Sequence, residues 1–207
     1  YARLGFDFTT SEVTPSREAL TAHIAGLPPC RWGVMINPAV DLGELTTLNT
    51  TVLDDRAESY DAQDGFLLVG ADGWTDRRQT LLEASLKRAP RPVLVGNPDL
   101  VAPRETGLSR EPGWFAHRLA DRTGVTPVFL GKPFGQVFDI ALDRFSRAIP
   151  PARVLMVGDT LHTDILGGAQ AGFATALVTG YGSLTGLDVG DAIAQAGLSP
   201  DFIVPNI

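Results

Sequence analysis

The chain has 207 residues, of which 44% are hydrophobic and 20% are charged, a balance that fits one globular domain or two small ones. Its formal net charge of -7 and its scattered Lys and Arg residues argue against the basic face by which proteins bind nucleic acid. No apolar run is long enough to span a bilayer, and Cys30 is the single cysteine, so we expect a cytoplasmic protein without disulfides or membrane contacts.

The N-terminal part of the chain predicts one helix and one strand. We expect the helix from about Thr14 to His23, because its first residue can cap it, Pro15 suits its first turn and Gly26 lies just past its end. A short buried strand follows from Trp32 to Ile36, and Asn37-Pro38 stops it.

Residues 39 to 64 show no clear period, although Thr50, Thr51 and Val52 favour a strand. Five carboxylates also gather in this stretch: Asp54, Asp55, Glu58, Asp61 and Asp64. Because they lack the regular spacing of metal ligands, we interpret them as a solvated loop rather than a metal site.

Residues 66 to 130 alternate more clearly between strand and helix. Apolar runs predict buried strands at 66–70, 93–95 and 128–130. Helices are predicted at 75–87 and 113–122. Residues 100 to 112 hold Pro103, Gly107 and Pro112 and are therefore predicted to form a long loop.

The clearest helix follows residue 133. Its apolar residues recur at helical spacing: Phe134, Val137, Phe138, Ala141, Leu142 and Phe145. Strands are then predicted at 154–157, 174–178 and 202–204, with helices from 164 to 171 and after Asp188. Strands that alternate with helices indicate an α/β fold with a mostly parallel sheet.

Two predicted strands end in residues suited to phosphate and metal chemistry. The strand predicted at 128–130 is followed by Lys132, and the strand predicted at 154–157 is followed by Asp159 and Asp164. Because parallel strands present their carboxyl ends at one edge, these side chains should lie together. Carboxylates are ligands of Mg2+, and a lysine suits a phosphate oxygen. Each residue alone is typical of a turn, a surface lysine or a helix cap, but the combination predicts a phosphoryl-transfer site.

These residues resemble known motifs. The segment VLMVGDTLHTDILGGAQAGF, residues 154–173, resembles the fourth motif of phosphatases of the haloacid dehalogenase (HAD) superfamily, and Gly131-Lys132-Pro133 resembles the third. Gly96-Asn97-Pro98-Asp99 and Val13-Thr14-Pro15-Ser16 resemble cap-flanking segments of the branch that includes NagD-type and p-nitrophenylphosphatase-like enzymes. The likeness is sharpest from Gly131 to Gly180.

The resemblance implies a three-layer, Rossmann-like core with a mostly parallel sheet and an inserted α/β cap domain. The core would comprise residues 1–25 and 129–207, and the cap residues 26–128. The partner implied is a small phosphorylated metabolite, and the resemblance also allows a homodimer formed through the cap.

The resemblance also implies the roles of individual residues. Asp159 would bind Mg2+, Asp164 would support the metal site, and Lys132 would hold the phosphate and the nucleophile. Substrate selection falls to the cap, where our candidates are Asn97, Asp99 and Arg104. We expect Mg2+-dependent hydrolysis of a small phosphate monoester, such as a sugar phosphate or a nucleotide, through an aspartyl phosphate.

The chain departs from the pattern of the family in two respects. The first motif, D-x-D-G, which supplies the nucleophile, and the second motif, which supplies a Ser or Thr, are both absent upstream of the expected cap. Asp7-Phe8-Thr9-Thr10 is only a weak imitation of the first motif. We expect a longer protein whose first portion carries that motif. A noncatalytic module that binds a phosphorylated metabolite is the alternative, and a phosphoacceptor regulatory domain is a weaker third interpretation.

Overall fold

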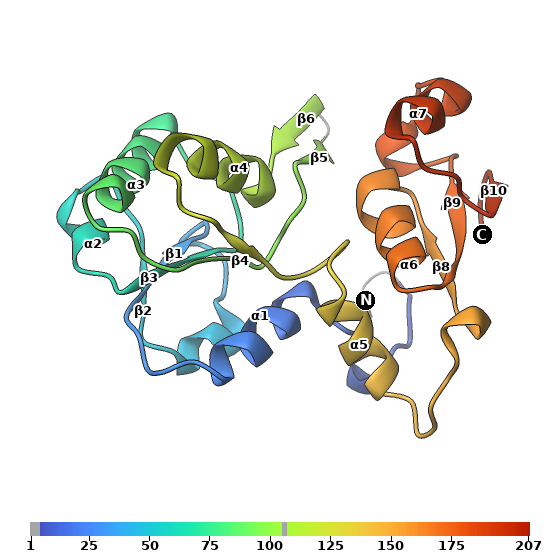
Figure 1. Cartoon of the computed structure of the whole chain (residues 1–207), viewed down its shortest axis with the longest axis horizontal. Helices are drawn as coiled ribbons and strands as arrows, with labels where there is room; N and C mark the ends of the chain where they lie inside the picture. The colour runs from blue at the N-terminus through green and yellow to red at the C-terminus, as the bar shows by residue number, and fades with distance from the viewer. Residues whose placement is uncertain (1–4, 105–106) are drawn as a thin grey trace. The chain divides into compact units, whose positions relative to one another are not determined.

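A computed structural model describes residues 5–104 and 107–207. The chain forms two compact units, one made of Tyr1–Pro15 with Lys132–Ile207 and the other of Ser16–Gly131 (Figure 1). The chain thus crosses between units after Pro15 and after Gly131, whereas the sequence placed the boundaries near residues 25 and 128. Within the described ranges, no helix is long and apolar enough to cross a membrane.

The unit Ser16–Gly131 contains a five-stranded sheet in the order β2-β1-β3-β4-β7, in which every neighbouring pair is parallel. The strands are β1 (Trp32–Met35), β2 (Thr50–Val52), β3 (Gly65–Leu68), β4 (Val93–Val95) and β7 (Val128–Phe129). The strands predicted at 32–36, 66–70, 93–95 and 128–130 are therefore confirmed.

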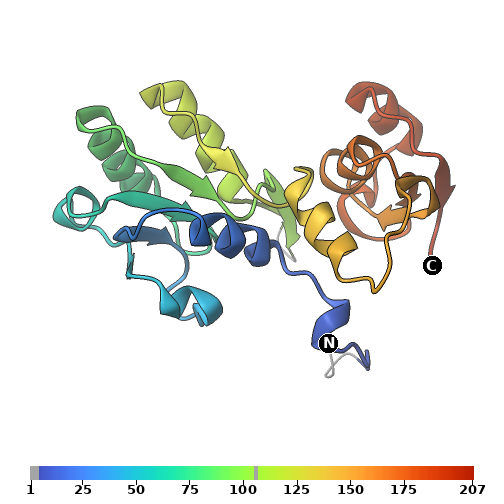
Figure 2. The ribbon, with the colours of Figure 1, turned by 60° about the horizontal axis from the view of Figure 1, so that its bottom comes forward.

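Helices cover both faces of this sheet. They are α1 (Ser16–Ala25), α2 (Glu58–Asp61), α3 (Asp76–Arg88) and α4 (Pro112–Thr123). Figures 1 and 2 show α3 and α4 on one side of the sheet and α1 on the other. Leu68, Leu82 and Leu119 are fully buried in one core cluster, each contributing about 1.5–3 kcal/mol by burial. Cover on both faces explains why β3 and β4 are continuous apolar runs.

The predicted loop at residues 100–112 was wrong. Strands β5 (Val101–Arg104) and β6 (Gly107–Arg110) form an antiparallel hairpin in which Ala102 lies opposite Ser109. The prediction was wrong because Pro103 was taken as a sign of a loop. Proline is excluded from central strands, but a two-stranded ribbon tolerates it at positions where the backbone nitrogen faces away from the partner strand.

The smaller unit contains a three-stranded parallel sheet in the order β10-β9-β8. Its strands are β8 (Leu155–Gly158), β9 (Ala174–Val178) and β10 (Phe202–Val204), and its helices are α5 (Gln136–Asp143), α6 (Leu166–Gln170) and α7 (Val189–Ala196). The predicted elements are confirmed, although α5 is shorter than its apolar stripe.

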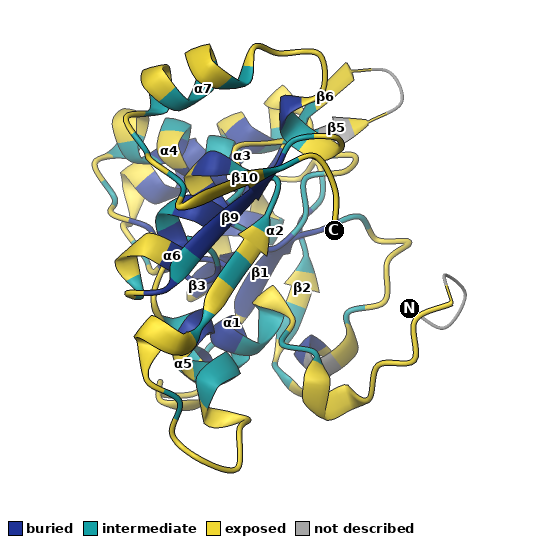
Figure 3. Cartoon of the chain, turned by 90° about the vertical axis from the view of Figure 1, so that its right-hand side faces the viewer, coloured by how far each residue is buried: buried dark blue, intermediate teal, exposed yellow. Residues whose placement is uncertain are grey.

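The two outer strands of this sheet are exposed. Figure 3 shows β9 buried and β10 exposed. Among the described strands, β8 has a partner on one side only, and its Leu155 and Val157 are 49% and 37% exposed. Apolar side chains along an unpaired strand edge are unusual in a parallel sheet, whose strands are normally covered.

Candidate functional site

The carboxyl end of β8 leads directly into two aspartates. Gly158 closes the strand, Asp159 follows it, and the π-helical turn Leu161–Ile165 carries Asp164 before α6 begins. Turns of this kind are uncommon and recur at functional sites. The local sequence thus presents two carboxylates within six residues at a strand end, where α/β proteins bind ligands.

Asp164 is a buried carboxylate, with 3% of the residue exposed. Its Oδ1 accepts a hydrogen bond from Lys132 Nζ at 2.5 Å, and its Oδ2 accepts one from the amide of Thr160 at 3.2 Å. Because a buried charge is costly unless it is paired, the lysine supplies the compensating charge. The Lys132 side chain is itself 39% exposed, so the ion pair is only partly shielded from solvent.

Gly158 makes room for this carboxylate. A Cβ atom at position 158 would overlap Cγ and Oδ2 of Asp164. The aspartate cannot move aside without losing its bonds to Lys132 and Thr160. The glycine is therefore required by the close approach of the side chain from the following turn.

Asp159 is held by the loop after β9. Its Oδ2 accepts a hydrogen bond from the amide of Ser183 at 2.9 Å, and the hydroxyl of Ser183 donates to its backbone carbonyl at 2.7 Å. Gly182 has φ of +83°, and a Cβ atom there would overlap the Asp159 carboxylate. Within the described residues, no hydrogen bond reaches Oδ1 of this half-buried side chain, which leaves that oxygen available to a ligand.

The candidates for substrate selection, Asn97, Asp99 and Arg104, lie in the turn after β4 and on β5. Asn97 Oδ1 accepts the amide of Asp99 at 3.1 Å in a turn after β4. Arg104 lies on β5, where its Nη2 donates to Glu111 Oε1 at 2.8 Å and its Nε donates to Ser109 Oγ at 2.9 Å. The asparagine thus stabilises a turn, whereas the arginine belongs to a separate polar group on the hairpin.

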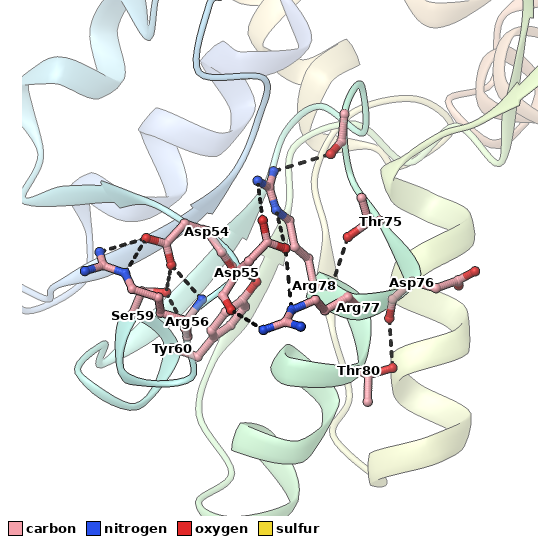
Figure 4. A network of polar contacts seen from close by, with 11 residues as sticks. Asp54, Asp55, Arg56, Ser59, Tyr60, Thr75, Asp76, Arg77, Arg78 and Thr80 are labelled. Atoms are coloured by element: carbon pink, nitrogen blue, oxygen red, sulfur yellow. Dashed lines mark hydrogen bonds and ion pairs between the residues drawn. The ribbon is translucent and has the colours of Figure 1, made fainter.

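The acidic stretch at 54–64 pairs with arginines. Asp54 accepts from Arg56 Nε at 2.8 Å, and Asp55 pairs with Arg78 at 3.1 Å (Figure 4). Hydrogen bonds from Arg56 and then Ser59 lower the pKa of Asp54 to about 2. In the part of the chain that the structure describes, no group of three or more His, Cys, Asp or Glu side chains could hold a metal.

Sequence reasoning missed Gly182 and Ser183, which position Asp159. The signal was present, because Thr179 and Gly180 begin a glycine-rich turn directly after a predicted strand. This signal is weak, because glycines after a strand are common and no sequence pattern links this turn to the residues after β8.

Comparisons with known proteins agree with this architecture. The family model described as HAD-hydrolase-like matches residues 129–207. Chronophin from Bos taurus is 31% identical over the whole chain, which covers 73% of that protein. A solved structure of a possible sugar phosphatase of the HAD superfamily from Cytophaga hutchinsonii superposes with a TM-score of 0.80 at 26% identity, and the match covers all of this chain and 75% of that one.

Other relatives match over a shorter stretch. Glycerol-3-phosphate phosphatase from Gallus gallus is 40% identical over 129 residues, which are 59% of this chain and 40% of that protein. The chain therefore spans less than half the length of that relative. The match to bovine chronophin nonetheless covers the whole of this chain. The solved structure from Cytophaga hutchinsonii confirms the α/β fold expected from the sequence. The chain belongs to the HAD superfamily, in the branch of NagD-type and p-nitrophenylphosphatase-like phosphatases.

Proposed function

We propose that the protein is a Mg2+-dependent phosphatase that hydrolyses small phosphate monoesters through an aspartyl phosphate. The observation that carries this proposal is the ion pair between Lys132 Nζ and Asp164 Oδ1, which lies beside the carboxyl end of β8, where Asp159 is placed. Relatives named as phosphatases support a catalytic role over a noncatalytic binding module.

Lys132 can hold the phosphate while it stays paired. An ammonium group has three N–H donors, and the bond to Asp164 uses one of them. Two donors remain for phosphate oxygens, and the side chain is 39% exposed. In this role Asp164 acts as a positioning residue, because its own oxygens are occupied by Lys132 and by the amide of Thr160.

Asp159 fits a Mg2+ ligand. Its Oδ2 is oriented by Ser183, and its Oδ1 has no hydrogen-bond partner within the described residues. Mg2+ is usually held by one or two carboxylates together with water and phosphate oxygens. The lack of a larger acidic cluster among the described residues is therefore compatible with a Mg2+ site. When bound, Mg2+ supplies positive charge that stabilises the transferring phosphoryl group.

The nucleophile would come from a segment outside these 207 residues. Its carboxylate oxygen would attack phosphorus as the P–O bond to the alcohol breaks, and the second aspartate of the D-x-D-G motif would give the leaving oxygen its proton. The same second aspartate would then take a proton from water, whose oxygen would attack phosphorus, releasing inorganic phosphate and restoring the carboxylate. The unpaired edge of β8, with exposed Leu155 and Val157, is suited to a further strand bearing that aspartate. Relatives that extend beyond this chain support such a segment. We further propose that Ser16–Gly131 is the cap and the smaller unit belongs to the core.

The test is phosphatase activity of the full-length protein over a panel of phosphate monoesters, with Mg2+ or with EDTA. We expect activity that requires Mg2+ and that falls at least a hundredfold in Asp159→Asn. Asp143→Asn, a matched change at an exposed residue of α5, should retain it. Full activity of Asp159→Asn, or activity unaffected by EDTA, would overturn the proposal.

A further inference from the structure

The loop that follows β9, residues 179–183, is anchored to the end of β10. The amide of Thr179 donates to the carbonyl of Val204 at 3.0 Å. The amide of Gly180 donates to the carbonyl of Pro205 at 2.9 Å. The other end of the same loop holds the proposed metal ligand through its serine. The loop therefore connects β10 to the metal site.

Both ends of this loop are in close contact with their neighbours. A Cβ atom at Gly180 would overlap the carbonyl oxygen of Pro205, so the loop backbone lies directly against the end of β10. A Cβ atom at Gly182 would overlap the carboxylate of Asp159. Because closely packed segments transmit displacements rather than absorb them, a shift of β10 would move the loop relative to the aspartate.

Strand β10 is held at its beginning but exposed along its length. The amide and the hydroxyl of Thr175 donate to Asp201 Oδ2 at 2.8 and 3.0 Å. Among the described strands, however, only β9 pairs with β10, and Phe202 and Ile203 are 55% and 54% exposed (Figure 3). An exposed strand that is paired on one side opens locally more readily than the buried strand beside it.

We infer that Val204 and Pro205 are positioning residues for Asp159. While β10 is docked, its end keeps the loop where Ser183 can hold the carboxylate. The inference rests on the proposed function, in which this carboxylate binds Mg2+. Groups that orient a metal ligand typically change metal affinity by about 10- to 100-fold when they are altered. Since coupling between two equilibria is reciprocal, bound Mg2+ must in turn oppose the release of β10.

The first experiment measures Mg2+ binding to the full-length protein by calorimetry, without substrate. Gly180→Ala forces the loop away from Pro205, so we expect its Kd for Mg2+ to rise at least about tenfold. Gly135→Ala is the matched control, because a Cβ atom there meets nothing within 4 Å, and it should bind Mg2+ as the wild type does. A merely structural role of β10 would lower the melting temperature of Gly180→Ala but leave the Kd of the folded protein unchanged.

The second experiment needs no substitution in the loop. It follows hydrogen exchange at the amides of Thr179 and Gly180 in the wild-type protein by NMR. At a Mg2+ concentration of about ten times Kd, the opened fraction and with it the exchange rate should fall about tenfold. In Asp159→Asn, the same Mg2+ concentration should leave both exchange rates unchanged.

Three results would overturn the inference and leave the proposed function standing. Gly180→Ala could bind Mg2+ as tightly as Gly135→Ala, Mg2+ could fail to slow exchange in the wild type, or it could slow exchange equally in Asp159→Asn. A wild-type protein that binds no Mg2+ would instead overturn the proposed function, and this inference with it.

Discussion

Substituting Gly158 by alanine should destabilise the smaller unit by about 4 kcal/mol. The new methyl group would overlap the Asp164 carboxylate, which is almost fully buried. If that side chain is displaced, its bonds to Lys132 and to the amide of Thr160 are lost, at about 1.5 kcal/mol each for hydrogen bonds to a charged group. The lower end of that range applies because the lysine is partly exposed. Overpacking adds about 1 kcal/mol or more.

Hydrogen exchange of peptides spanning residues 155–166 is the suitable assay. Trp32, Trp74 and Trp114 all belong to the other unit, so tryptophan fluorescence would not report on β8. Gly135→Ala is the control, because a Cβ atom there meets nothing within 4 Å. Protection of β8 in Gly158→Ala equal to that in the control would refute the argument.

Two further predictions concern other contacts. Gly182→Ala should lower the free energy of unfolding, measured in urea, by at least about 1 kcal/mol more than Gly186→Ala. Both glycines have φ near +80°, but only a Cβ atom at position 182 would collide with Asp159. Equal losses in the two variants would contradict this prediction. The pKa of Asp64 is lowered from 3.8 to about 2, chiefly by its hydrogen bond from Arg31, so its stabilisation is complete above pH 3.8 and is lost as pH falls through 2. Asp64→Asn should therefore flatten the acid limb of a plot of melting temperature against pH, and an unchanged limb would contradict this.

The sequence predicted that Lys132 and Asp164 lie close together, and the structure pairs them, but not for the reason given. The prediction assumed that the strands before Lys132 and before Asp159 end at one edge of a common sheet. In the structure β7 belongs to the five-stranded sheet and β8 to the three-stranded sheet, so the pairing comes from the chain after β7 and not from neighbouring strands. The strands and helices around them were predictable because their apolar residues follow clear periods.

Contacts between distant segments were not predictable. Ser183 reaches Asp159 from the loop after the next strand, a connection that no local period encodes. The β5–β6 hairpin was hidden by its proline and glycine, which ordinarily indicate a loop. Glu111 gave no signal either, because its burial depends on Arg104 and Ser109 from that same hairpin.

The most direct test of the central claim is the rate at which the full-length protein carrying Lys132→Met hydrolyses p-nitrophenyl phosphate at saturating Mg2+. Removing one charged donor from a phosphoryl-transfer site costs about 100- to 1,000-fold in kcat, and we expect a loss in that range. A rate within twofold of the wild type would show that Lys132 does not contact the transferring phosphate.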